Sequence, residues 1–140
     1  EPSLGVDRTL LVVMLEAYHE EQARTAEEGE TDLRVVLRFP KALAPFKVAL
    51  LPLSKKEELS VPARALAATL RQRWATDYDE TQSIGKRYRR QDEIGTPYCV
   101  TYDFDSLKDQ SVTVRDRDTM RQERVKIGDL EGYIANKLGF

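Results

Sequence analysis

The stretch KVALLPLSKKEELSVPARALAATLRQRW, residues 47–74, decides the fold. Its first residues, Lys47 to Leu53, form a nearly continuous apolar run of strand length, which predicts a central strand covered on both faces. Apolar side chains then recur at helical spacing from Leu59 to Trp74. A buried strand that leads into an amphipathic helix indicates an α/β sheet with helices packed on it.

The start of this helix has two possible positions. Ser54 and Glu57 form a capping-box pattern, but Pro62 conflicts with a helix that begins at Ser54. Either the helix kinks at Pro62, or Ser60 is the cap and Pro62 lies in the first turn.

The chain after Trp74 continues the pattern of strands and helices. Ser83 is a suitable cap for a second helix and Gly95 a suitable stop, while period-two alternation predicts strands further on. The expected elements are a strand near 76–79, a helix over 83–94, three strands around 98–104, 112–114 and 125–127, and a helix from 129. This order predicts an α/β fold with a mixed sheet of about five strands.

The N-terminal part differs in character. Thr9 to Gln22 is predicted to form a helix whose first half, Leu10 to Leu15, is apolar around its whole circumference. The apolar side chains of such a helix must be shielded from water, so we expect it to pack on a neighbouring copy, to fold onto the domain or to fray. The acidic residues 23–32 are expected to form a surface connector, and Leu33 to Phe39 an edge strand or linker.

Composition favours one globular domain of ordinary size. The chain has 140 residues, 41% hydrophobic and 33% charged, and no stretch approaches the apolar length that spans a bilayer. Without a signal-like start we expect a cytoplasmic protein that does not bind membranes. Cys99 lies in a strand-like run and is predicted to be a buried thiol, and the lone His19 is not expected to bind metal.

The net charge of −2 conceals an asymmetry. Residues 1–32 carry a net charge of −7, whereas residues 33–140 carry +5. A polyanion would therefore prefer the second part. The alternative is that these cations are mostly solvated.

Two clusters combine residue types that bind charged ligands. The octapeptide EPSLGVDR, residues 1–8, places Glu1 where it would pair with an ammonium group and Arg8 at a helix N-terminus, where its guanidinium suits phosphate oxygens. An ordinary capped turn is the alternative. In the second cluster, three cations share one helix face and would follow a phosphate backbone unless they are merely solvated: Lys86, Arg89 and Arg90.

EPSLGVDR resembles the third signature motif of class II aminoacyl-tRNA synthetases, in the form EPS-x-G-x-DR typical of the glycyl-tRNA synthetase family. The segments LAPFKVALLPLSKKEEL, SIGKRYRRQDEIGTPYCVTYDFD and VTVRDRDTMRQERVKI resemble the C-terminal anticodon-binding domain of that family. The first two signature motifs have no counterpart in these residues. The resemblance therefore implies a C-terminal fragment, with residues 1–32 left from the catalytic domain and residues 33–140 forming the anticodon-binding domain.

The resemblance also implies substrates and partners. The intact enzyme would attach glycine to its tRNA with ATP and magnesium, and would form a homodimer through segments that this chain lacks. Glycine would be bound by Glu1, Ser3 and Gly5, and ATP by Gly5, Val6, Asp7 and Arg8. This chain alone is expected to be inactive and to bind no cofactor, and to self-associate, if it does so, through Leu10–Leu15.

The partner expected for this chain is glycine tRNA, whose anticodons end in two cytosines. The pairing edge of cytosine offers one amino donor and two acceptors, so an aspartate beside an arginine is complementary to it. We expect Arg115, Asp116 and Arg117 to contact those bases, with Tyr102 or Phe104 as stacking partners. The alternative is an internal salt-bridge ladder that fixes the turn.

A function of another class stays open. A non-catalytic accessory protein of the same fold, which binds nucleic acid or a partner protein, would share the domain. Retention of the glycine- and ATP-binding residues of the octapeptide argues against it. A small-molecule enzyme is not supported, because the sequence has no Gly-rich phosphate loop and only one His and one Cys.

Overall fold

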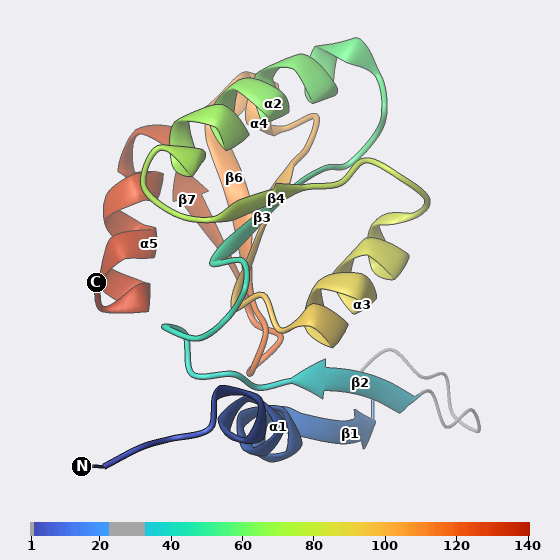
Figure 1. The fold of residues 1–140 in the computed structure, drawn as a ribbon. Coiled ribbons are helices and arrows are strands. Elements are labelled where there is room, and N and C mark those ends of the chain that lie inside the picture. Colours follow the sequence, from blue (N-terminus) through green and yellow to red (C-terminus); the bar gives the residue numbers. More distant parts are fainter. Residues whose placement is uncertain (1, 23–32) are drawn as a thin grey trace.

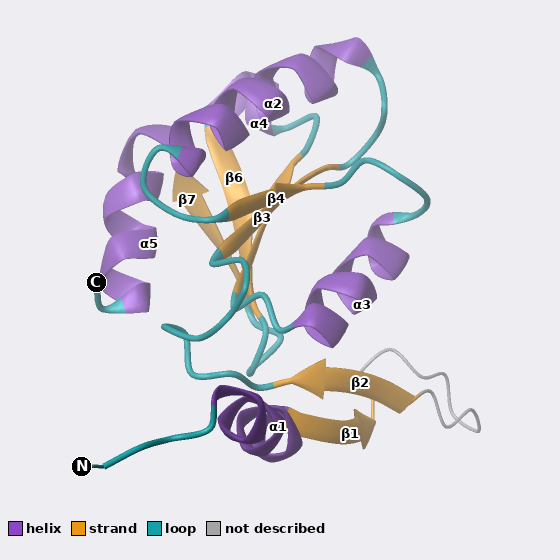
Figure 2. Ribbon diagram, in the orientation of Figure 1, coloured by secondary structure: helices purple, strands orange, loops and turns teal. Residues whose placement is uncertain are grey.

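A computed structural model describes residues 2–22 and 33–140. Its centre is a five-stranded mixed sheet with the strand order β4-β3-β5-β6-β7 (Figures 1 and 2). The central strand β3 pairs in parallel with β4 and β5, and β6 and β7 extend the sheet in antiparallel fashion. The strands are β3 (Val48–Pro52), β4 (Thr76–Tyr78), β5 (Tyr98–Tyr102), β6 (Ser111–Asp116) and β7 (Gln122–Lys126). The predicted mixed sheet is confirmed.

Helices cover both faces of this sheet (Figure 1). The larger core lies between one face and the helices α2 (Glu57–Arg71) and α5 (Leu130–Leu138). On the opposite face, Ala49, Leu51 and Cys99 pack against α3 (Ile84–Ile94). The short α4 (Ser106–Asp109) and η1 (Ile127–Asp129) join β5 to β6 and β7 to α5. The strand β3 is buried along its whole length, as its apolar run predicts.

Both predicted starts of α2 are wrong. The helix begins at Glu57 with Lys56 as its N-cap, and Pro62 lies inside it. The hydroxyl of Ser54 instead accepts a hydrogen bond from the backbone N–H of Lys56 at 3.3 Å, in the turn before the helix. Pro62 has no N–H to donate to the carbonyl oxygen of Glu58, and packing of Leu59 and Ala63 in the main core stabilises the helix around it.

The N-terminal helix is shorter than the sequence predicts. The helix α1 (Val6–Ala17) ends at Ala17, and β1 (Tyr18–Gln22) pairs in antiparallel register with β2 (Leu33–Leu37). The predicted continuation of the helix to Gln22 is therefore wrong, and His19 lies in a strand. The physical reason is tertiary pairing, because the apolar run of β2 provides backbone partners that local helix propensity cannot reveal.

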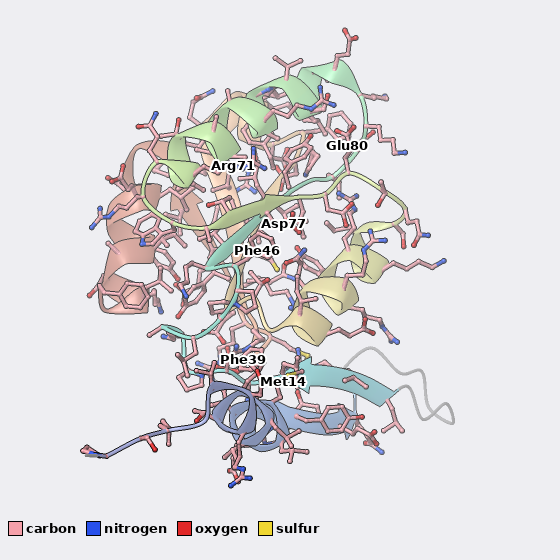
Figure 3. The ribbon with its side chains drawn as sticks, in the orientation of Figure 1. Met14, Phe39, Phe46, Arg71, Asp77 and Glu80 are labelled. Carbon is pink, nitrogen blue, oxygen red and sulfur yellow. The ribbon has the colours of Figure 1, made fainter. Side chains whose placement is uncertain are left out.

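Of the three outcomes considered for α1, the structure shows that the helix folds onto the domain. Val13 and Ala17 pack in a small cluster with Leu37, Phe39 and Ala44. Figure 3 shows Met14 of α1 beside Phe39 at this junction. The opposite side of α1 stays exposed, with Leu11 and Leu15 more than half accessible to solvent.

Two sequence-based expectations are not resolved by this fold. The acidic connector 23–32 lies outside the described residues. The boundary between residues 1–32 and 33–140 stays a prediction, and the pairing of β1 with β2 joins its two sides. Among the helices that the structure describes, none has the length and apolar character needed to cross a membrane.

Candidate nucleic-acid interface

Strand register assigns each residue of the sheet to a face. Because side chains alternate along a strand, residues that are paired across neighbouring strands share a face. Leu51 pairs with Thr101, Thr101 with Thr113, and Thr113 with Arg124, so these four lie on the α3 face. On this face the residues are apolar beneath α3 and become polar toward β7.

We call four residues of β6 and β7 on this face the polar row: Thr113, Gln122, Arg124 and Lys126. Thr113 is partly exposed and the other three are exposed. Sequence reasoning missed all of them because it followed the buried partners, Val112, Val114 and Val125. The signal was present, since the residues between inward-facing valines must face outward in period two.

The carboxyl ends of β3, β4 and β5 form the neighbouring edge of the sheet. The chain leaves β3 through α2 on one face and returns to β5 through α3 on the other (Figure 2). Open α/β sheets bind ligands at such a point, where the connections change face. Phe104 follows β5 there with 38% of its surface exposed, and Lys56 Nζ lies 5.4 Å from the centre of its ring.

A cluster of charged residues, Arg124 with Asp103 and Asp109, lies where the polar row meets the carboxyl edge of the sheet. Arg124 donates hydrogen bonds of 2.7 and 3.1 Å to Asp103, and also contacts Asp109. These hydrogen bonds raise the pKa of Arg124, although partial burial opposes them. Burial alone would raise the pKa of Asp103, but hydrogen bonds from Arg124 and Ser106 outweigh it and lower the value. The donors of Arg124 are thus used within the cluster, where they hold the two carboxylates in place at this edge.

For Arg115 and Arg117 the structure favours the internal alternative. Arg115 is 7% exposed and donates 2.8 and 3.0 Å hydrogen bonds to the two carboxylate oxygens of Asp92. Arg117 is 3% exposed and donates to the carbonyl oxygens of Gly95 and Phe39. The expectation that these two guanidiniums face splayed bases does not fit their positions, because both are buried and donate to groups inside the protein.

The remaining predicted contacts fall in different environments. Asp116 accepts hydrogen bonds from the backbone N–H groups of Asp118 and Thr119 and so closes the β6–β7 turn. Tyr102 is buried in the main core, where it offers no face to a base, whereas Phe104 is accessible. Whether Asp116 or Phe104 contacts a base stays a prediction.

The cations of α3 lie as the helical wheel predicts. Lys86 is exposed and Arg89 partly exposed, while Arg87 turns inward and donates to the carbonyl oxygen of Pro52. Arg90 is partly exposed and pairs with Asp79 at 2.5 Å. Part of the predicted phosphate-binding charge is therefore balanced within the domain, and Lys86 keeps the most exposed position.

The geometry of this domain has counterparts in known proteins. A family model described as the anticodon binding domain matches residues 47–137. The chain belongs to this family.

Individual relatives agree with the family. This chain is 57% identical over 138 residues to the glycine–tRNA ligase of Corynebacterium efficiens, and the match covers 99% of this chain and 30% of that protein. It is 59% identical over 140 residues to the glycine–tRNA ligase of Ruminiclostridium cellulolyticum, covering 100% of this chain and 29% of that protein. The chain thus spans about 30% of the length of these curated relatives, and the resemblance to glycyl-tRNA synthetases is confirmed.

A solved structure supports the fold. The prolyl-tRNA synthetase of Cryptosporidium parvum, in complex with L-proline and AMP, superimposes with a TM-score of 0.68 at 23% identity. The match covers 74% of this chain and 22% of that one. At this identity the similarity concerns the architecture alone.

Residues 2–8 of the octapeptide lead into α1 and form its first turn. Ser3, Val6, Asp7 and Arg8 are exposed, and Gly5 is the N-cap of α1. Glu1 lies outside the described residues. Within 2–22 and 33–140, no group of three or more His, Cys, Asp or Glu side chains is placed to hold a metal ion. The glycine and ATP contacts predicted for this segment stay predictions.

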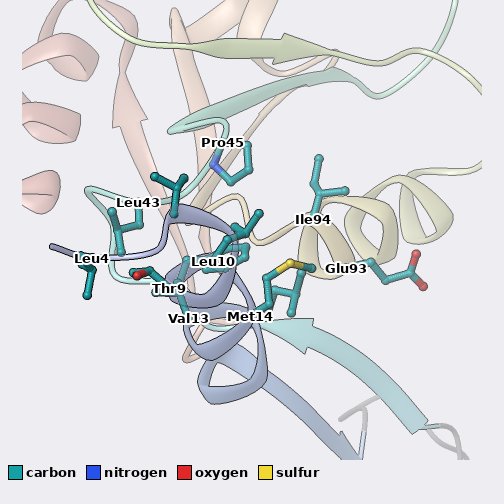
Figure 4. Close-up of a pocket in the computed structure, with 12 residues that line it drawn as sticks. Leu4, Thr9, Leu10, Val13, Met14, Leu43, Pro45, Glu93 and Ile94 are labelled. Atoms are coloured by element: carbon teal, nitrogen blue, oxygen red, sulfur yellow. The ribbon is translucent and has the colours of Figure 1, made fainter.

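An apolar groove of about 630 Å³ separates α1 from the anticodon-binding domain (Figure 4). Leu10, Val13 and Met14 form one wall, and Pro45 and Ile94 lie opposite. The apolar circumference of α1 is thus only partly covered.

Proposed function

We propose that this chain recognises the anticodon of glycine tRNA as one part of a longer glycine–tRNA ligase. The observation that carries the proposal is the polar row, an open and polar strip on a sheet whose other surfaces are covered by helices. Family membership and the names of the relatives support the kind of ligand. In this proposal the longer protein attaches glycine to its tRNA, and this chain contributes recognition.

Recognition is proposed to use the polar row and the carboxyl edge together. Single-stranded RNA bases are bound by stacking on aromatic rings and by hydrogen bonds to their pairing edges. Phe104 offers the accessible ring, and Gln122 offers an amide with both a donor and an acceptor for a cytosine edge. Lys86 on α3 would contact the phosphate backbone.

The octapeptide is proposed to serve the catalytic part of the longer protein. Glu1, Ser3 and Gly5 would contact glycine, while the residues from Gly5 to Arg8 would contact ATP, which the intact enzyme uses with magnesium. The exposed start of α1 and the exposed Arg8 suit this role. Because the first two signature motifs have no counterpart in this chain, we expect this chain alone to show no adenylation.

The exposed face of α1, which carries Leu11 and Leu15 of the Leu10–Leu15 run, is proposed to be covered by the remainder of the longer protein. The isolated chain is proposed to self-associate through the same face. We further propose a cytoplasmic enzyme that forms a homodimer through segments outside this chain. Sedimentation of the isolated chain with and without the change Leu11→Lys would test the self-association.

Anticodon recognition is tested by binding of labelled RNA stem-loops. The glycine anticodon stem-loop is expected to bind more tightly than one whose two cytosines are replaced, by about 1–3 kcal/mol for each base that is hydrogen-bonded. Gln122→Ala should reduce this preference. Equal binding of both stem-loops at every salt concentration would contradict base recognition and leave only phosphate attraction.

The proposed contact of Lys86 with the phosphate backbone of the RNA is tested by a matched pair of variants. Lys86→Ala should weaken binding of all stem-loops alike and lower the slope of log affinity against log salt by about 1. Arg73→Ala removes an exposed cation from the turn after α2, on the opposite face of the sheet, and should leave binding unchanged. An equal effect of the two variants would contradict the proposed face.

A further inference from the structure

The carboxylate of Asp92 joins two parts of the molecule that are far apart in the sequence. It is 1% exposed and accepts hydrogen bonds from Arg115 on β6 and, at 2.9 Å, from Arg34 on β2. Arg34 is itself 3% exposed. We call these three residues the Asp92 junction.

On one side the Asp92 junction reaches the proposed RNA-binding face. Arg115 lies on the same face as Gln122, its direct partner on β7. Its guanidinium carbon is 4.8 Å from the centre of the Tyr88 ring, and the Tyr88 hydroxyl is hydrogen-bonded to Thr101. Tyr88 is partly exposed, so the bidentate pairing of Arg115 with Asp92 fixes the surface on which that ring rests.

On the other side the Asp92 junction holds the β1–β2 hairpin. Besides Asp92, Arg34 donates to the carboxylate of Glu21 on β1 and, at 2.7 Å, to the carbonyl oxygen of Arg117. Every hydrogen-bonding nitrogen of Arg34 therefore has a partner. One buried carboxylate thus balances a cation from the hairpin and a cation from the sheet.

We infer that Asp92 is a positioning residue through which the hairpin, by way of Arg34, holds Arg115 and Tyr88 in the arrangement that RNA binds. This inference rests on the proposed anticodon recognition. Arg34 donates to Oδ2 of Asp92, whereas Arg115 donates to both carboxylate oxygens. Without Arg34 only Arg115 holds the carboxylate, and the Arg115–Asp92 pair is free to shift together. By linkage, RNA bound at the face also stabilises the docked hairpin.

The test compares two arginines of the hairpin. Arg34→Met removes the contact with Asp92, whereas Arg38→Met removes a cation that pairs with Glu21 and Asp118 but not with Asp92. Arg34→Met is expected to lower affinity for the glycine anticodon stem-loop about fivefold, with an unchanged salt slope because no phosphate contact is lost. Arg38→Met should leave affinity unchanged, and Arg34→Lys should recover part of the loss.

Hydrogen exchange supplies the reciprocal measurement. In the unmodified chain, bound stem-loop should slow exchange of the β1–β2 amides, and this protection should vanish in Arg34→Met. If Arg34→Met speeds hairpin exchange but leaves RNA affinity unchanged, or if Arg38→Met weakens binding equally, the positioning role is wrong although anticodon recognition stands. If the unmodified chain binds no stem-loop, both proposals fail, which the affinity measurement shows before any variant is made.

Discussion

Gly95 lies against the ring of Phe39, and a β-carbon at Gly95 would come within 2.5 Å of Phe39 Cδ2. The same position would be 2.7 Å from the carbonyl oxygen of Leu37. The C-terminus of α3 and the end of the hairpin therefore meet at a point where only a glycine fits. Because Gly95 also has a φ of +82°, it serves as the left-handed C-cap of α3.

Substitutions at Gly95 and Gly139 distinguish the cost of a steric clash from the cost of a left-handed backbone conformation. Gly95→Ala should lower the free energy of unfolding by about 3 kcal/mol, since it adds a clash to the cost of a left-handed conformation. Gly139→Ala is the matched control, because Gly139 has a φ of +83° with no atom within 4 Å of the added carbon. It should cost about 1 kcal/mol. Urea unfolding measures both, and equal losses would contradict the close contact.

Arg117 is expected to be a stabilising residue of the hairpin junction. Its buried guanidinium donates to the carbonyl oxygens of Leu37, Phe39 and Gly95 and to the carboxylate of Asp118. Arg117→Met would remove a donor from each of these acceptors and should cost about 3–5 kcal/mol of stability. The exposed Arg121 provides the control, and Arg121→Met should change stability by less than about 0.5 kcal/mol. A loss under about 1 kcal/mol in Arg117→Met would disprove the role.

Acid should destabilise the folded protein through four carboxylates. Burial alone would raise the pKa of each, but hydrogen bonds and nearby arginines outweigh it and lower the values of Glu21, Asp79, Asp103 and Asp118. A lowered folded-state pKa gives stability that is complete above the unfolded values, about 4, and is lost as pH falls through the folded values. The melting temperature at fixed ionic strength should therefore hold from pH 7 to about 5 and fall below pH 4.

The variant Arg124→Met tests how much of this acid sensitivity comes from Asp103. Arg124→Met removes the principal partner of Asp103, so the pKa of Asp103 should rise toward its unfolded value and the decrease in melting temperature below pH 4 should become smaller. Identical pH profiles for the variant and the unmodified chain would show that this pair contributes nothing to acid sensitivity.

Cys99 should be inert in the native protein. Burial raises the pKa of its thiol to about 12, and the thiolate is the reactive form. A thiol-specific disulfide reagent at pH 8 should therefore modify Cys99 only after a denaturant unfolds the chain. Rapid modification of the folded protein would show that β5 opens locally.

The sequence predicted the sheet domain because its signals are local. The apolar run of β3, the alternation along β5 and the glycine after α3 each act within a few residues. The octapeptide and the long match to the glycyl-tRNA synthetase family indicated the kind of protein. Charge pattern also placed Lys86 on an exposed helix face, since helical period is fixed by backbone geometry.

Tertiary structure alone decided which charges face solvent. Arg115 and Arg124 both lie on β strands in charged segments, yet one is buried against Asp92 and the other is exposed beside Asp103. Whether each arginine is buried or exposed depends on an acidic partner more than 20 residues away in the chain. Long-range pairing also explains why residues 18–22, which the sequence predicted to be helical, form the strand β1. Local sequence determines which elements form, but burial of a charge depends on long-range pairing, because only a distant opposite charge can compensate its loss of hydration.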